Sequence, residues 1–166
     1  NTKNIFLRES KELIYAIKKS CQIKMFFVNK DVNEKGLRMK LNFGHTFAHA
    51  IEAKNKYSKK ITHGEAVLSG MIIASRLSSL MKICNKKTVN EIEEIYSENN
   101  LSYTFKKFSN TKEIYNLIPF LKNDKKNNDK NINFILLKKI GVTSPPYKNK
   151  ISIDKLKKYC NAIARY

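Results

Sequence analysis

Three histidines, the only ones in this 166-residue chain, lie within nineteen positions of one another: His45, His49 and His63. On a helix, the four-residue spacing of His45 and His49 places both imidazoles on one face, one turn apart, where both can reach a single point. This spacing is used for zinc in helical metal sites. The HExxH motif of metalloproteases is not met, because Thr46 stands where its catalytic Glu belongs. His63 precedes GEA at the expected start of the next helix, from which it could turn back toward the first two histidines.

One helix is expected over residues 37–55, and it would gather further polar groups beside these histidines. Five side chains would fall within an arc of about 80°: Arg38, Asn42, His45, His49 and Glu52. A solvated face of so lysine-rich a chain should carry lysines, so this face is expected to border a cleft. A lone histidine is best interpreted as structural, whereas a cluster of three favours a site. Spacing alone leaves open which of them bind a metal and which act as an acid, a base or a phosphate donor.

The net charge of +19 arises mostly from lysines scattered along the chain, which has only four arginines. Nucleic-acid surfaces use arginine for bidentate contacts, so solvated faces explain the charge better than a specific nucleic-acid partner. Lys24 and Arg38 would suit an anionic, phosphorylated substrate. The lysines of the 122–130 loop could also bind a phosphate, but composition alone favours a mobile solvated turn there. The three cysteines are far apart and odd in number, which favours a reduced, cytosolic protein with core thiols. The chain contains no run of eighteen apolar residues, so no membrane-spanning helix is predicted.

The apolar periodicity predicts a mainly α fold. Helices are expected over these ranges: 9–28, 37–55, 63–82, 111–121 and 153–165, with another starting at a Thr88–Glu91 capping box. INFILL, residues 132–137, is expected to form a short buried strand, and TSPPYKNK a turn region. No glycine-rich dinucleotide loop is found. The chain also starts without Met, so a fragment or an excised domain is expected.

The segments LRMKLNFGHTFAHAIE and HGEAVLSGM together resemble the 3-dehydroquinate synthases of the shikimate pathway. AIKKSCQIKMFFVNKDVNEKGLR resembles the family segment that leads into them, and LKNDKKNNDKNINFILLKKIG resembles its late lysine loop and strand. These matches cover nearly the whole chain in the family's order. Related sugar-phosphate cyclases share much of the pattern.

The resemblance implies that residues 1–166 form the multi-helical, metal- and substrate-binding C-terminal domain of a dehydroquinate synthase-like fold. The enzymes are cytoplasmic carbon–oxygen lyases that convert 3-deoxy-arabino-heptulosonate 7-phosphate to 3-dehydroquinate and phosphate. They use transient oxidation by NAD⁺ and a divalent metal, usually zinc. The family's N-terminal NAD-binding domain, with the glutamate that is the third metal ligand, is absent from this chain, so the chain alone should lack catalysis. A homodimer is expected for the complete enzyme.

The resemblance also implies roles for individual residues. His45 and His63 match the two metal-binding histidines, and His49 matches the catalytic histidine that contacts the substrate near its phosphate. Five further positions match substrate-binding residues: Lys24, Glu34, Arg38, Asn42 and Lys125, with Lys122 and Lys126 as alternatives for the last. Ala48 departs from the family's usual glycine, which adds one methyl group to the helix.

Three other functions were weighed against this one. Another sugar-phosphate cyclase would share the motifs. A helical metal-dependent phosphohydrolase commonly shows an adjacent His-Asp pair, and this sequence has none. A basic nucleic-acid-binding module would need an arginine-rich or aromatic-interleaved stripe, which is also missing.

Overall fold

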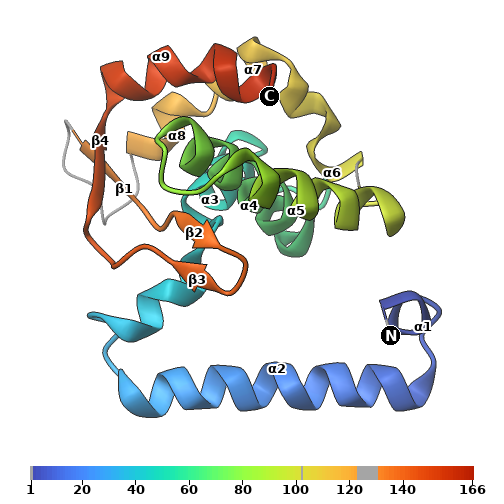
Figure 1. Cartoon of the computed structure of the whole chain (residues 1–166). Coiled ribbons are helices and arrows are strands. Elements are labelled where there is room, and N and C mark those ends of the chain that lie inside the picture. The colour runs from blue at the N-terminus through green and yellow to red at the C-terminus, as the bar shows by residue number, and fades with distance from the viewer. Residues whose placement is uncertain (1, 102, 123–130) are drawn as a thin grey trace. The chain divides into compact units, whose positions relative to one another are not determined.

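The computed structural model describes residues 2–101, 103–122 and 131–166, and the chain divides into two compact units, Asn1–Leu41 and Asn42–Tyr166. The first unit contains α1 (Thr2–Phe6), α2 (Ser10–Lys30) and most of the 3₁₀ helix η1 (Leu37–Asn42) (Figure 1). The helix predicted over residues 9–28 is therefore confirmed as α2.

The loop after α2 is held by the side chain of Asp31. Its carboxylate accepts hydrogen bonds from the backbone N–H groups of Lys35, Gly36 and Arg38 at 3.0, 2.8 and 3.0 Å. The bonds from Lys35 and Arg38 are the largest causes that lower the pKa of Asp31, because they favour the charged form. One carboxylate thus fixes the backbone of residues 31–38.

The single helix predicted over residues 37–55 is wrong. The chain forms η1 up to Asn42, breaks, and begins α3 (His45–Lys54) three residues later. Gly44, the residue before α3, has a φ of +83°, in the left-handed region that glycine adopts without a steric penalty. A helix cannot continue through that conformation.

This break changes the face that the sequence predicted. His45, His49 and Glu52 share α3, so their common face is retained. Arg38 and Asn42 belong to η1 instead, and the predicted arc of five side chains is not formed.

The second unit is built around α4 (His63–Leu80), which begins where the sequence predicted. Its N-terminus carries a capping box: Glu65 N–H donates to the Thr62 hydroxyl at 3.3 Å, and Thr62 N–H donates to the Glu65 carboxylate at 2.8 Å. Nearly every residue of α4 from Ser69 to Ser78 is buried, and most of these residues are small or apolar, so the helix is central.

Helices α3 and α4 pack together where two glycines meet. A Cβ atom added to Gly70 of α4 would lie 2.2 Å from the carbonyl oxygen of Gly44 and 3.0 Å from the amide nitrogen of Ala48. A Cβ atom on Gly44 would lie 2.7 Å from the backbone nitrogen of Met71. The absence of a side chain at Gly70 thus permits the close approach of α3 and α4.

The remaining helices of this unit pack on α4, on α3 or on the C-terminal helix (Figure 1). They are α5 (Lys86–Glu98), α6 (Tyr103–Lys106), α7 (Thr111–Tyr115), α8 (Ile118–Lys122) and α9 (Ile153–Ala164), together with the 3₁₀ helix η2 (Lys107–Ser109). The prediction of a last helix over 153–165 is confirmed by α9, whose buried side includes Leu156, Cys160 and Ile163.

Two of the helix predictions need correction. The α5 helix is capped by Asn85, whose side chain accepts from Thr88 N–H at 2.8 Å, so the predicted Thr88–Glu91 capping box is wrong. The helix predicted over 111–121 is divided into α7 and α8. Pro119 explains the division, because its ring would clash with the carbonyl four residues earlier in one continuous helix.

The β element consists of two short antiparallel pairs. Strand β1 (Asn131–Phe134) pairs with β4 (Asn149–Ser152), with Ile132 opposite Ile151, and β2 (Leu137–Lys139) pairs with β3 (Val142–Thr143). The predicted strand over 132–137 is thus shared between β1 and β2, and it is buried as expected. The TSPPYKNK segment, expected to be a turn, contributes residues to β3 and β4.

The core of the second unit joins α3, α4, α9 and β1. Phe47 of α3 stacks on Phe134 of β1, with ring centroids 5.0 Å apart. Cys160 is buried here, as expected of a core thiol, whereas Cys84 is half-buried and Cys21 of α2 is exposed. In the described part of the chain, no helix is long and apolar enough to cross a membrane. The prediction of a mainly α fold with a minor β element is confirmed.

Candidate metal site

The three histidines come together at the N-terminal ends of α3 and α4. The ring centroid of His45 lies 5.8 Å from that of His49 and 5.6 Å from that of His63. His45 is the first residue of α3 and His63 the first of α4, so the glycine contact between the two helices also sets the distance between these two imidazoles. The predicted clustering of the three side chains is confirmed.

The ring separations suit ligands of a single cation. Two imidazoles whose nitrogens each lie about 2.0–2.1 Å from a tetrahedral zinc ion have ring centroids about 5 Å apart. The pair His45 and His63 is within 1 Å of that value, and so is the pair His45 and His49. Within the described ranges, no three His, Cys, Asp or Glu side chains are close enough to hold a metal by themselves. Two of these imidazoles could supply only part of a metal's donor set.

Hydrogen bonds give His45 and His63 the same protonation pattern. Nδ1 of His63 lies 2.9 Å from Oε1 of Glu52, and Nδ1 of His45 lies 3.4 Å, a long contact, from the carbonyl oxygen of Phe43. Carbonyl and carboxylate oxygens accept hydrogen bonds, so Nδ1 is the donating nitrogen in each contact, and in a neutral ring the lone pair then lies on Nε2. Metal-binding histidines usually show this arrangement.

The electrostatics of His45 favour the neutral ring that a cation needs. Burial is the largest cause that lowers the pKa of His45, and the nearby His49 and His63 rings lower it further, against the opposing effects of Phe43 and Glu52. A lower pKa means that the imidazole is unprotonated near neutral pH and competes less with protons for its Nε2 lone pair.

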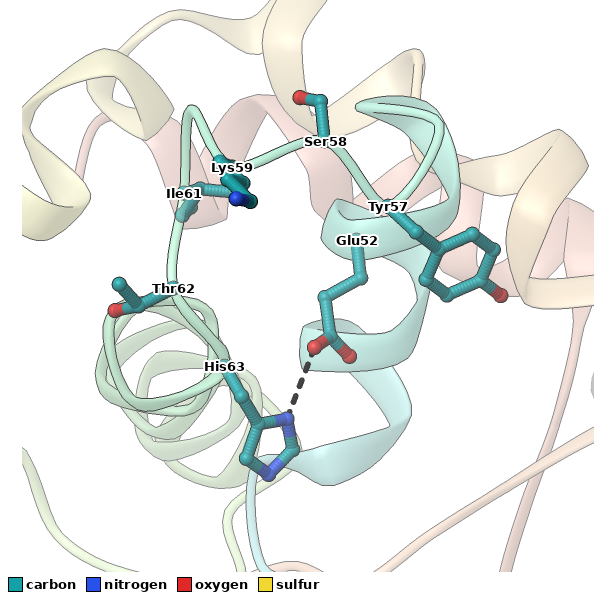
Figure 2. Close-up of a pocket in the computed structure, with 7 residues that line it drawn as sticks. All are labelled: Glu52, Tyr57, Ser58, Lys59, Ile61, Thr62 and His63. Atoms are coloured by element: carbon teal, nitrogen blue, oxygen red, sulfur yellow. Dashed lines mark hydrogen bonds and ion pairs between the residues drawn. The ribbon is translucent and has the colours of Figure 1, made fainter.

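An open pocket of about 460 Å³ lies beside His63, under the connection between α3 and α4 (Figure 2). Figure 2 shows Glu52 reaching from α3 to His63, which stands at the pocket's edge. The other lining residues are Tyr57, Ser58, Lys59, Ile61 and Thr62.

The first unit holds three of the predicted substrate-binding residues. Arg38 Nε lies 3.7 Å from the Glu34 carboxylate, and Arg38 Nη1 donates to the carbonyl of Val32 at 2.9 Å. Lys24 is an exposed residue of α2. The structure therefore brings Glu34 and Arg38 together on the loop that Asp31 holds.

The other predicted positions lie in the second unit or outside the described residues. Asn42 ends η1 in the second unit. Lys125 and its alternative Lys126 lie outside the described residues, and Lys122 ends α8.

Sequence reasoning missed two residues with clear structural roles. Glu52 was placed on the polar face that carries His45 and His49, but its hydrogen bond to His63 was not predicted. Asp31 stood in a loop rich in Asn, Asp and Gly, a typical place for a side chain that hydrogen-bonds nearby backbone.

The family model for the 3-dehydroquinate synthase C-terminal region matches residues 1–127. The chain belongs to the 3-dehydroquinate synthase family. A 3-dehydroquinate synthase of Pelagibacter ubique (strain HTCC1062) is 47% identical over 148 residues, which are 89% of this chain and 40% of that protein. The 3-dehydroquinate synthase of Endomicrobium trichonymphae is 42% identical, over 90% of this chain and 40% of that protein. The chain thus spans about two fifths of the length of these relatives.

Two solved structures of 2-deoxy-scyllo-inosose synthase share the fold. A 2-deoxy-scyllo-inosose synthase complexed with carbaglucose-6-phosphate, NAD⁺ and Co²⁺ matches with a TM-score of 0.75 and 23% identity, over 92% of this chain and 42% of that one. A second structure of 2-deoxy-scyllo-inosose synthase matches with a TM-score of 0.73 and 22% identity, over 93% of this chain and 40% of the other. At this identity the matches bear on the fold alone, and they confirm the dehydroquinate synthase-like architecture.

Proposed function

We propose that this chain is the C-terminal, metal- and substrate-binding part of a 3-dehydroquinate synthase. The complete enzyme would convert 3-deoxy-arabino-heptulosonate 7-phosphate to 3-dehydroquinate and phosphate, as a carbon–oxygen lyase that depends on NAD⁺. The family membership and the identity to relatives of that name support this function. The chain has about two fifths of their length, so the NAD-binding domain and a third metal ligand are assigned to the rest of the enzyme.

The observation that carries the proposal is the shared hydrogen-bonding pattern of His45 and His63. Both have Nδ1 engaged by an oxygen, both have Nε2 available, and their rings are 5.6 Å apart. These two residues would hold the cation. When bound, it supplies Lewis-acid chemistry and a template for substrate hydroxyls. Two imidazoles with one carboxylate are a common zinc donor set, which supports zinc as the metal.

The third histidine is proposed to be catalytic and not a ligand. His49 lies one turn beyond His45, with its ring edge-on to that of His45. From there it can exchange a proton with the substrate or donate a hydrogen bond to the phosphate.

The anionic ends of the substrate need cationic and polar partners. Arg38, held by Glu34 and the Val32 carbonyl, offers a planar guanidinium of fixed orientation to a carboxylate or a phosphate. Lys24 and Asn42 join it as proposed substrate contacts, and Lys125 is proposed for the loop lysine. The homodimer and the cytoplasmic location also stay predictions from the family.

The experiment separates metal binding from catalysis in the complete enzyme. We expect His45→Ala and His63→Ala to lose bound metal and activity together, because each removes one of two ligands. We expect His49→Ala to retain the metal and lose activity. Bound metal is measured by atomic emission, and activity by phosphate release with NAD⁺ present. Lys87→Ala, an exposed residue of α5, is the control.

Three results would contradict the proposal. Metal loss in His49→Ala with retention in His45→Ala would reverse the assignment. Phosphate release that does not require NAD⁺ would favour the phosphohydrolase instead. The structural neighbour is complexed with carbaglucose-6-phosphate. If the complete enzyme converted glucose 6-phosphate and not the heptulosonate, another sugar-phosphate cyclase would be favoured.

A further inference from the structure

Glu52 links the two helices that carry the metal-binding histidines. It lies on α3, seven residues after His45, and its Oε1 is 2.9 Å from Nδ1 of His63 at the start of α4 (Figure 2). The Glu52 side chain is 16% exposed, whereas that of His63 is 59% exposed. The Glu52 carboxylate is thus largely buried, while the His63 ring that it contacts is mostly exposed.

The His63 ring would lack a defined orientation without this contact. It is the first residue of its helix and mostly exposed, so packing alone does not select one rotamer or one tautomer. A carboxylate at Nδ1 selects the tautomer with hydrogen on Nδ1 and leaves the lone pair on Nε2. It also turns the ring about its side-chain bonds until Nδ1 faces α3.

We propose that Glu52 is a positioning residue for metal binding, which orients His63 so that its Nε2 meets the cation. This inference rests on the proposed function, since it assigns a partner to one of the two ligands proposed there. A carboxylate that hydrogen-bonds a metal-binding imidazole fixes its tautomer and raises its basicity, and removal of such a partner typically lowers metal affinity 10–100-fold. Glu52 acts through His63 and does not touch the cation.

Two other roles for Glu52 make different predictions. As a direct metal ligand, it would change the number or type of coordinating atoms when it is replaced. As a purely structural clamp between α3 and α4, it would affect stability and leave the affinity of the folded protein for metal unchanged.

The test is a titration of the metal-free complete enzyme with Co²⁺, followed by the visible absorption of the bound ion. The variants are Glu52→Ala and Glu52→Gln, because the glutamine carbonyl can still accept a hydrogen bond from Nδ1. The control is Glu113→Gln, which removes a carboxylate that pairs with Lys54, at the other end of α3, at 2.5 Å. We expect a 10–100-fold weaker Co²⁺ affinity for Glu52→Ala, a smaller loss for Glu52→Gln, and no loss for the control. At saturation, all should show the wild-type spectrum.

The possible outcomes separate this inference from the proposed function. A wild-type enzyme that binds no Co²⁺ at the His45 and His63 site would overturn the proposed function itself. If the wild type binds Co²⁺ and Glu52→Ala binds it with equal affinity, only the positioning role is overturned. A changed spectrum at saturation in the Glu52 variants would also overturn it, in favour of direct ligation. Circular dichroism of each metal-free variant shows whether it is folded, and the glutamine variant provides the comparison if the alanine variant does not fold.

Discussion

The contact between Gly70 and the backbone of α3 makes the substitution Gly70→Ala informative. The added Cβ atom would lie 2.2 Å from the Gly44 oxygen and 3.0 Å from the Ala48 nitrogen. Real Cβ atoms are not found nearer than 3.0 Å to such atoms, so the helices must separate by nearly 1 Å at this point. Both neighbours are backbone atoms, and no side-chain rotation can relieve the overlap.

The expected cost follows from two opposing effects. Overpacking of a tight contact costs about 1–3 kcal/mol, and the backbone overlap places Gly70→Ala near the upper end. Alanine in place of glycine within a helix recovers up to about 1 kcal/mol. We therefore expect the free energy of unfolding to fall by about 2 kcal/mol, a substantial share of the 5–15 kcal/mol typical of a folded protein.

The same displacement should weaken metal binding, because His45 follows Gly44 directly and would move away from His63. The assay is urea unfolding followed by circular dichroism, together with a Co²⁺ titration of the folded variant. Gly64→Ala is the matched control: it makes the same change in the same helix, and its Cβ atom would meet nothing within 4 Å. The control should be neutral or slightly stabilising. A Gly70→Ala variant as stable as the wild type would refute the argument that this glycine sets the helix separation.

Two further predictions concern the core of the second unit. Glu93→Ala should lower the free energy of unfolding by about 2 kcal/mol, because Arg76, whose side chain is 7% exposed, would lose the carboxylate at 2.7 Å and retain a buried charge. Glu91→Ala is the control, because Glu91 of the same helix forms an exposed ion pair with Lys87. In the same urea experiment it should lower the free energy of unfolding by less than about 0.5 kcal/mol. Equal losses for the two variants would contradict this prediction. Burial raises the pKa of the Cys160 thiol to about 11, so only about one molecule in a thousand carries the reactive thiolate at about pH 8. A disulfide reagent should therefore modify Cys160 only after unfolding while it modifies the exposed Cys21 in the native protein, and rapid native modification of Cys160 would refute its burial.

Local sequence signals were most reliable where one helix explains the pattern. The start of α4 at His63 and the helix α9 were both predicted. The helix over 37–55 was wrong because its apolar spacing is compatible with one long helix, whereas a left-handed Gly44 breaks it. That glycine lies so close to Met71, twenty-seven residues later, that a Cβ atom would overlap it, and no local pattern can reveal this proximity.

The candidate site shows the same division between local and distant information. The four-residue spacing of His45 and His49 already implied one helix face, and the ring distance of 5.8 Å agrees with it. The partner of His63 could not be inferred in this way. Glu52 and His63 lie on different helices, and their hydrogen bond depends on how those helices cross.

The sequence by itself determined which residues could do chemistry, because residue type and helical spacing are local properties of the chain. It also determined the family and the mainly helical fold, since both are carried by motifs and apolar periodicity along the chain. Only the tertiary structure decided that His45 and His63 face one another, and that Glu52 holds the second of these. The physical reason is that their separation is set by backbone packing between Gly44 and Gly70, a contact between segments that local preferences do not specify.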